Sequence, residues 1–563
     1  MQTVSSRFLT RINGRMRPLN WSVLMSLTRE LDPSATFFTV GVSAVGGGDI
    51  IMGTDDVIQI WDQYNYTDYS DRVVSLEWSQ TLNPQNSVQS AIGTLVLDNH
   101  DHYFGADNVA YPFRPVRISV GFGNDLTGYA ELLPQFVGLT SAPVLDETAK
   151  TVTYQLSDFL QSLYNEPLTT AAALQNVRTD QALSALLQLV GLSPTQFDLD
   201  VGMNIIPFWY VDNTTTFGAA VEQLMQAEMG RLFMSETGRI TFWNRQHYSQ
   251  DIVATFDRSN TLDYTTNAQT DIINAVWITA DIRQVQPNQA YWDQKSTTDT
   301  TNYTAIAPSA SVIVTATFSD PVASVDTPAA GGSTSYFTAN TASNGSGTDV
   351  SASVSVSVID YCTSYQMTFT NTLDETIYIT DIELYAAPAT VINTIYVRQE
   401  DSASIDQYDQ QLLQITNDFF PDAATVNSRA LMILYDYANY NQLQTLTVKA
   451  NPALEINDPI ACAVRERSYL SVSGDTLSDV ATAYDVTLSY LEALNPTLPH
   501  SGSLTDGTSV NLGFLPEVCI VVGIDNVLDG PPFKQVLSCM PFSPTNYFTI
   551  GISSVGGSDQ VAP

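Results

Sequence analysis

Residues 74–78 read Val74-Ser75-Leu76-Glu77-Trp78, and this alternation of apolar and polar side chains is the clearest sign of the fold. The same period of two returns in Gly93-Thr94-Leu95-Val96-Leu97 and in Val116-Arg117-Ile118-Ser119-Val120, with Asn, Gly and Pro between the runs. Such a period places one face of a strand in a core and the other in water. We therefore expect residues 72–160 to form a small β-barrel or sandwich.

Two helices and a hairpin are predicted next. Apolar residues at i, i+3, i+4 and i+7 after Thr179-Asp180 predict a helix that ends at Gly191. A second helix ends at Gly230, and residues 231–245 read as a hairpin about Glu236-Thr237-Gly238. The apolar faces comprise Leu183, Leu186, Leu187 and Val190, then Phe217, Val221, Leu224 and Met225. This segment is predicted to be α+β.

Residues 296–397 contain no Lys or Arg and consist largely of Ser, Thr, Ala and Val. Alternation with β-branched residues at 309–318, 350–359 and 376–384 argues against disorder, so we expect an inserted β-sandwich. Two more helices are predicted after it. Residues 404–407 look like a capping box at the start of the first. The expected helix faces comprise Ile405, Tyr408, Leu412 and Ile415, then Val426, Ala430, Ile433, Leu434 and Tyr437.

The charge of the chain is strongly acidic and unevenly placed. Lys plus Arg number 22 against 59 Asp plus Glu, a net charge of −37, which disfavours binding to nucleic acid along the whole surface. Residues 1–29 nevertheless hold five arginines and no acid, so the rest of the chain carries −42. We expect these arginines to bind acidic residues of a neighbouring subunit, with an exposed, unordered tail as the alternative. The candidate partner-binding residues are Arg7, Arg11, Arg15 and Arg17.

Catalytic and metal-binding patterns are weak, so we expect no enzyme activity, cofactor or bound metal. The sequence contains no G-x-S-x-G, H-E-x-x-H or P-loop motif. His100 and His102 with Asp98 and Asp101 favour a polar turn over a metal site, because a closed set of ligands is not evident. A pair of catalytic carboxylates stays open, since their separation in space decides that question. The four cysteines, Cys362, Cys462, Cys519 and Cys539, are interpreted as buried apolar residues. No membrane span or signal peptide is expected.

A short internal repeat has one copy near each end of the chain. Phe38-Thr39-Val40-Gly41-Val42-Ser43-Ala44-Val45-Gly46-Gly47-Gly48-Asp49 matches residues 548–559 at eight of twelve positions. The copies are 510 residues apart with nothing repeated between them, which excludes a solenoid. The two copies either fill equivalent strand-edge positions in a symmetric assembly or are unrelated strands that end in Gly-Gly turns.

The strongest local pattern spans residues 469–512. It reads Tyr469-x-x-Val472-Ser473-Gly474-Asp475-Thr476-Leu477-Ser478-Asp479-Val480-Ala481, followed by Leu491, Asn495-Pro496, Leu504, Gly507, Val510 and Leu512. This pattern resembles a LysM domain, and the resemblance implies a strand, two helices and a strand. It also implies that two loops bind glycan containing N-acetylglucosamine. Those loops hold Gly474, Asp475, Thr476 and Leu477, then Asn495, Pro496, Thr497 and Leu498.

Two observations qualify that resemblance. Gly474 and Asp475 supply a turn and a helix start whether or not a sugar binds. Residues 459–464 and 518–524, on either side of the pattern, read as partner strands of one sheet. We therefore expect the LysM-like module to be inserted at the tip of a hairpin.

The sequence around this module resembles a larger family, the tail hub (minor tail or baseplate hub) proteins of long-tailed bacteriophages. The resemblance covers residues 70–285 and 375–557, and no single piece of it is specific. Its pieces are residues 73–78, Gly93-Thr94-Leu95-Val96-Leu97-Asp98-Asn99-x-Asp101, residues 114–118, 136–138, 230–242 and 376–380, Ser404-Ile405-Asp406-x-Tyr408, residues 451–458 and residues 551–556. The basic N-terminus, residues 296–397 and the LysM-like module depart from the family.

Together, the strand and helix patterns and the two resemblances predict a mainly β protein with α+β modules: a multidomain β-barrel hub with an inserted β-sandwich and an inserted LysM (βααβ) domain. The hub resemblance alone implies a homotrimer at the tail tip of the virion that contacts the distal tail protein ring, the tape-measure protein and tip or receptor-binding proteins. DNA would pass through its lumen without specific binding, and peptidoglycan is a further partner if the module binds glycan. The expected divisions are 1–60 (basic segment and first repeat copy), 61–165 (β-barrel), 166–285 (α/β module), 286–397 (β-sandwich), 398–465 (hub helices and strands), 466–513 (LysM-like domain) and 514–563 (hub strands and second repeat copy).

Two other function classes are kept open. A cellular LysM protein that binds cell walls is disfavoured, because a single LysM-like module lies within a strand pair. A tail-associated enzyme that cleaves peptidoglycan is disfavoured, because no catalytic arrangement is evident.

Overall fold

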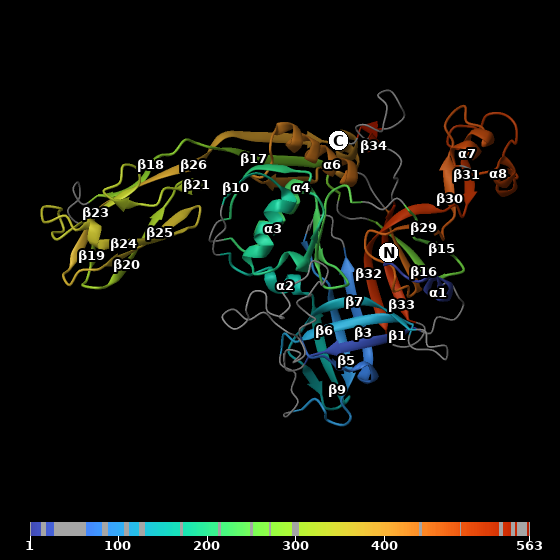
Figure 1. Cartoon of the computed structure of the whole chain (residues 1–563). Helices are drawn as coiled ribbons and strands as arrows, with labels where there is room; N and C mark the ends of the chain where they lie inside the picture. Colours follow the sequence, from blue (N-terminus) through green and yellow to red (C-terminus); the bar gives the residue numbers. More distant parts are fainter. Residues whose placement is uncertain are drawn as a thin grey trace.

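The chain is mainly β, as predicted, and its strands form several separate sheets (Figure 1). The structure is a computed structural model, which describes residues 2–12, 19–26, 64–81, 88–105, 112–122, 130–168, 173–211, 215–247, 251–268, 272–295, 303–438, 442–484, 486–528, 533–541, 547–548 and 560–561. Both copies of the internal repeat lie outside these residues, except Phe548. That residue ends the two-residue strand β34 (Tyr547–Phe548), which pairs with β35 (Gln560–Val561).

A 14-stranded sheet joins the first part of the chain to the last. Its pairing path runs β16-β28-β33-β32-β3-β5-β9-β7-β6-β1-β2, with β15, β29 and β8 beside it, and in the described residues this path is open. The strands are β1 (Asn20–Met25), β2 (Thr67–Asp68), β3 (Val73–Thr81), β5 (Ile92–Asp98), β6 (Pro115–Phe122), β7 (Glu131–Thr140), β8 (Val144–Asp146), β9 (Thr151–Ser157), β15 (Ala254–Asp257), β16 (Thr261–Ala268), β28 (Gln442–Lys449), β29 (Pro459–Ala463), β32 (Glu517–Leu528) and β33 (Lys534–Pro541). A 3₁₀ turn (Ser70–Arg72) precedes β3.

The strand β32 belongs to both halves of this sheet. Its first residues pair with β29, with Ile520 opposite Pro459, and its last residues pair with β3, with Leu528 opposite Leu76. Each half has its own apolar core. One core gathers β1, β3, β5, β6, β7 and β9, whereas the other gathers β15, β28, β29, β32 and β33. All four cysteines of the chain are buried without a disulfide, as predicted, and three of them lie in the second core.

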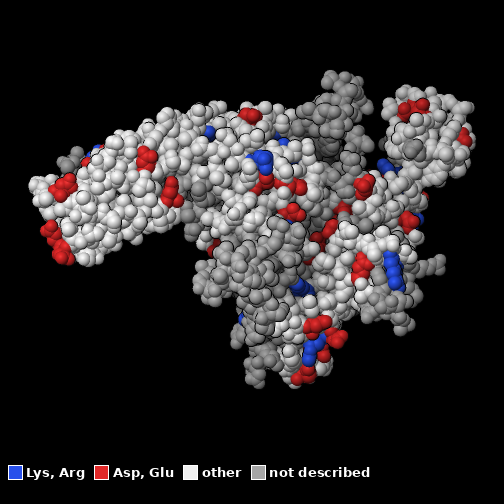
Figure 2. Space-filling view, in the orientation of Figure 1, with Lys and Arg blue, Asp and Glu red and all other residues white. Residues whose placement is uncertain are grey.

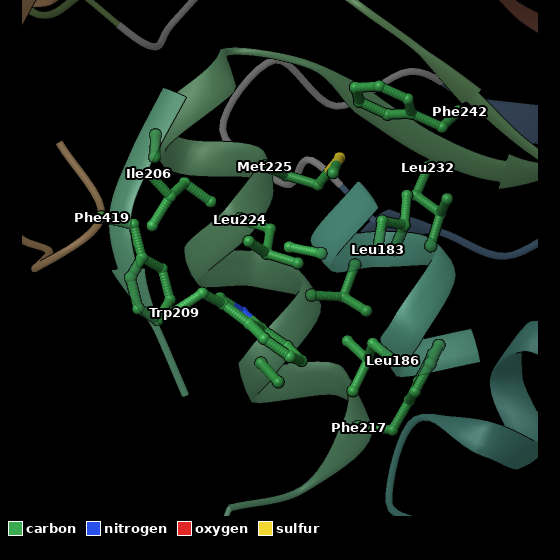
Figure 3. Close-up of a cluster of buried hydrophobic side chains, with 14 of the residues drawn as sticks. Leu183, Leu186, Ile206, Trp209, Phe217, Leu224, Met225, Leu232, Phe242 and Phe419 are labelled. Atoms are coloured by element: carbon green, nitrogen blue, oxygen red, sulfur yellow. The ribbon is translucent and has the colours of Figure 1, made fainter. Parts of the chain in front are cut away.

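The α/β module packs two helices against short strands (Figure 3). The elements are β4 (Val88–Gln89), α2 (Phe159–Leu163), β10 (Leu174–Arg178), α3 (Thr179–Leu189), a 3₁₀ turn (Pro194–Gln196), β11 (Phe197–Leu199), β12 (Ile205–Trp209), α4 (Phe217–Glu228), β13 (Arg231–Met234) and β14 (Ile240–Trp243). Trp209 is fully buried among leucines of both helices. The predicted hairpin at 231–245 is confirmed, with Arg231 opposite Trp243. Helix α4 ends at Glu228, two residues before the predicted Gly230, because Met229 itself adopts a left-handed conformation (φ 57°).

Two long antiparallel strands connect the inserted sandwich to the rest of the chain. The strand β26 (Ile377–Glu400) pairs through its second half with β17 (Ala275–Val285). Its first half lies in the sandwich with β18 (Gln289–Lys295), β19 (Thr304–Ile306), β21 (Val322–Val325) and β23 (Tyr336–Asn340), beside which lies β22 (Ala329–Ala330). A second sheet, β20 (Ser311–Thr317), β24 (Val354–Asp360) and β25 (Ser364–Asn371), closes the core, and a 3₁₀ turn (Ser351–Ser353) precedes β24. Because β26 crosses residue 397, the sandwich shares its last strand with the module that follows.

The prediction of one helix through residues 405–415 is wrong. Helix α5 (Ser402–Tyr408) ends where Asp409 adopts φ 58°, and β27 (Leu412–Thr416) then pairs in parallel with β17. The side chain of Asp401, rather than that of Ser404, caps α5. The next helix is confirmed as α6 (Ala423–Tyr437), whose predicted apolar face packs on β17 and β26.

The residues after β29 form a small module of their own. Its elements are β30 (Arg467–Leu470), α7 (Leu477–Ala483), α8 (Leu488–Leu494) and β31 (Ser509–Gly513). The strands on either side of it, β29 and β32, are antiparallel neighbours, so the predicted insertion at a hairpin tip is confirmed. This module and the sandwich project from opposite ends of the body in Figure 1.

A buried carboxylate fixes the α/β module. Glu228 is fully buried at the end of α4. Its Oε2 accepts hydrogen bonds from Thr179 Oγ1 at 2.9 Å and from the backbone N–H groups of Met203 and Asn204 at 3.1 and 2.7 Å. Its Oε1 lies 3.2 Å from Arg245 Nη1. The carboxylate therefore joins the start of α3, the segment before β12 and the end of α4.

We expect Glu228→Gln to destabilise this module by about 3 kcal/mol, because the amide removes the buried charge that pairs with half-buried Arg245. Hydrogen exchange at Met203 and Asn204 should rise sharply. Glu222→Gln is the matched control, since Glu222 is half-buried on the same helix and accepts from Tyr164. Equal exchange in the two variants would contradict the role given to Glu228.

Candidate functional site

The module at residues 467–513 has the predicted order of strand, helix, helix, strand. Its strands β30 and β31 are antiparallel, with Tyr469 opposite Val510. Its apolar core comprises Leu477, Val480, Ala481, Leu491, Leu504, Val510 and Leu512, all from within the module. Leu477 lies in the first predicted glycan-binding loop, and Leu498 of the second loop packs against the same core. Packing against this shared core therefore holds both loops in one small domain.

In the first loop, Asp475 is held by its neighbours. Its Oδ2 accepts from Tyr469 Oη at 2.6 Å and from the backbone N–H of Val472 at 2.8 Å, and these bonds lower the pKa of Asp475. Gly474 has φ 104°, a conformation that a side chain would strain. Asp475 therefore stays ionised and shapes a tight, exposed turn.

Thr476 and Leu477 begin helix α7. The Thr476 hydroxyl accepts from the backbone N–H of Asp479 at 3.2 Å, and the Asp479 carboxylate accepts from the backbone N–H of Thr476 at 2.9 Å. This reciprocal capping satisfies two N–H groups at the helix start. The Thr476 side chain thus has a structural partner, and Leu477 is buried.

In the second loop, Asn495 is buried and fully bonded. Its Nδ2 donates to the backbone carbonyls of Leu491 and Asn511 at 2.9 and 2.7 Å. Its Oδ1 accepts from the backbone N–H of Asn511 at 2.7 Å. The amide therefore joins the end of α8 to β31.

Exposure separates the predicted glycan-binding residues into two groups. Gly474, Pro496 and Thr497 are exposed, whereas Asp475, Thr476 and Asn495 bond within the module. A ligand at these loops would meet the exposed group and the backbone around it. Sequence reasoning missed Leu470 and Val472, which are 64% and 60% exposed beside the first loop. Their alternation with the inward-facing Tyr469 and Ser471 was the available signal.

The predicted partner-binding arginines are only partly described. Arg7 and Arg11 lie one turn apart on α1 (Ser6–Ile12), whereas Arg15 and Arg17 lie outside the described residues. Phe8 and Ile12 are buried in the core of the first half-sheet, and the Arg11 guanidinium carbon lies 5.4 Å from the centre of the Phe122 ring. Residues 2–12 therefore dock on the body, unlike the exposed tail that the sequence left as an alternative.

In the part of the chain that the structure describes, His, Cys, Asp and Glu residues form no group of three that could hold a metal ion. Asp98 contacts His100, and His102 Nδ1 lies 3.8 Å from Glu147, consistent with a polar turn. None of the described helices is long and apolar enough to cross a membrane.

Comparison with protein-family models and with curated proteins finds no match. Among solved structures, the chain is similar to a tail protein from Neisseria meningitidis MC58 (8% identity, TM-score 0.43, covering 93% of this chain and 97% of that one). It is also similar to a 43 kDa tail protein of prophage MuSo2 from Shewanella oneidensis (10%, 0.39, 84% and 95%). A third is prophage tail protein gp18 from Listeria monocytogenes EGD-e (9%, 0.37, 85% and 93%). All three TM-scores lie below 0.5, so a shared fold does not follow from them.

Substitutions in the two groups of loop residues should differ in their effect on the stability of the module. We expect Asn495→Ala to destabilise the module by about 1–3 kcal/mol, because it removes the side-chain partners of the Asn511 backbone N–H and carbonyl. Thr497→Ala, at an exposed position, should change stability by less than about 0.5 kcal/mol. The measurement is hydrogen exchange at Asn511 in the full chain. Similar exchange in both variants would show that Asn495 does not hold α8 to β31.

Proposed function

We propose that the chain is a structural subunit of a long-tailed bacteriophage, placed at the tail tip as a hub. The observation that carries the proposal is the position of the segments that resemble tail hub proteins. Residues 73–78, 93–98, 115–118 and 136–138 fall on β3, β5, β6 and β7, all in the 14-stranded sheet. A resemblance spread over strands of one sheet is the pattern expected when a whole domain is shared.

The proposed assembly is a homotrimer in the virion that contacts the distal tail protein ring, the tape-measure protein and tip or receptor-binding proteins. The net charge of −42 beyond residue 29 suits a lumen through which DNA passes without binding, because like charges repel the phosphates. Arg7 and Arg11 are proposed to bind acidic groups of a neighbouring tail subunit. Their place on a docked helix supports this, since it presents both side chains from a fixed element.

The module at 467–513 is proposed to be a LysM-like domain that binds cell-wall glycan during host attachment. Its βααβ order, its separate core and the exposed Gly474, Pro496 and Thr497 support this role. Residues 466–513 carry a net charge of −5, so attraction to anionic wall polymers is not the mechanism. Recognition would depend on hydrogen bonds and apolar contacts, and would respond weakly to salt.

Glycan binding can be tested by pull-down with purified peptidoglycan and by titration with chitin oligomers. We expect the full chain to bind at both low and raised salt. A variant in which a short Gly-containing turn replaces residues 467–514 should lose binding yet keep its fold, because β29 and β32 are neighbours without the module. If the full chain fails to bind chitin oligomers at millimolar concentration, the module is a structural spacer.

The proposed role of the N-terminal arginines can be tested without disturbing the core. Deletion of residues 1–20 would also remove the buried Phe8 and Ile12, so the double variant Arg7→Gln with Arg11→Gln is the sharper test. We expect this variant to fold normally and to be incorporated into tails less efficiently than the wild type. Thr10→Ala, on the same helix, should be incorporated normally. Normal incorporation of the double variant would remove these arginines from the interface.

A further inference from the structure

The βααβ module is joined to the body only by two short tethers among the described residues. Residues 464–466 connect β29 to β30, and residues 514–516 connect β31 to β32. The module core draws every member from residues 469–515, so it shares no apolar core with the body. Figures 1 and 2 show the module standing off the body above a narrow neck. Its orientation must therefore depend on contacts at the tethers.

One body residue, Arg258, contacts both tethers. Its Nε donates a hydrogen bond to the backbone carbonyl of Val464 at 3.3 Å, in the incoming tether. Its guanidinium carbon lies 4.1 Å from the centre of the Phe514 ring, in the outgoing tether. That distance is well within the range of an attractive cation–π contact. A planar guanidinium can donate from its edge while its face covers a ring, which a lysine ammonium cannot do.

The backbone of Arg258 is itself held in place. It lies in a tight turn between β15 and β16, where Asp257 Oδ1 accepts from the Ser259 N–H at 2.8 Å and from its hydroxyl at 2.6 Å. Asn260 Nδ2 donates to the carbonyl of Thr255 at 2.9 Å, which closes the turn. The strand before the turn, β15, pairs with β29 in the body sheet. Arg258 thus reaches the tethers from a rigid part of the body.

We propose that Arg258 is a positioning residue that sets the orientation of the βααβ module relative to the body, and thereby the direction in which its two exposed loops face. Its importance for host attachment rests on the proposed glycan binding, whereas its effect on orientation does not. A second contact supports the same neck, because Arg465 Nη2 lies 3.5 Å from Glu517, which also accepts from Gln444. That ion pair joins the incoming tether to the first residue of β32.

The test is a distance measurement in the full chain by electron paramagnetic resonance. Spin labels are attached at Ser478→Cys in the module and Thr265→Cys in the body, both exposed, whereas the four native cysteines are buried. We expect Arg258→Ala to make the distance distribution at least about twice as wide, because the neck loses both contacts. Phe514→Leu should widen it in the same direction, and Arg258→Lys should not restore the wild-type width.

Arg467→Ala is the matched control. It removes the same charge at the base of the module, but Arg467 lies over the Tyr484 ring inside the module and should leave the distribution unchanged. Wild-type widths in both Arg258→Ala and Phe514→Leu would overturn the proposal. If Arg258→Ala proves unstable, Phe514→Leu alone decides, since it alters a tether and not the body. Failure of the wild type to bind peptidoglycan would overturn the glycan-binding proposal and leave this one intact.

Discussion

The pairing of β32 with three other strands is the constraint on which the rest of the structure depends. β32 lies against β33 on one edge and against β29 and then β3 on the other. Strands from residues 20–157 and from residues 442–541 thereby enter one sheet. Each inserted segment must therefore begin and end at positions that leave the hydrogen bonds between these strands intact. The sandwich does so along the β17–β26 ribbon, and the βααβ module does so at the tip of the β29–β32 hairpin.

Much of the fold follows from local sequence. Alternation of apolar and polar residues located β3, β5 and β6, and helical spacing located α3, α4 and α6, because each element buries one face. The failure at residues 405–415 has a clear cause. Leu412 and Ile415 fit a helical spacing equally well, and only the parallel pairing with β17, more than 120 residues earlier, makes them a strand. Pairings between distant residues leave no local signal of this kind.

The location of the candidate site could be predicted from the sequence, but the hydrogen-bond partners of its side chains could not. The order of Gly474, Asp475, Thr476 and Asn495 located both loops, because turns and helix caps demand particular residues at particular positions. The same residue types serve as ligands and as structural partners, so only the hydrogen bonds reveal that Asp475 and Asn495 are occupied. Nothing in the sequence near Arg258 pointed to the tethers, since the residues that it contacts lie more than 200 positions away.

The length of β26 has a mechanical consequence. At about 3.3 Å per residue, its 24 residues reach roughly 80 Å from the sandwich core to the layer beneath α6. Because β17 and β26 both run between the body and the sandwich, a pull on the sandwich along this ribbon is shared by two backbones in parallel. The ribbon would therefore act as a stiff strut that carries force from the far end of the sandwich into the apolar core around Val276 and Ile278.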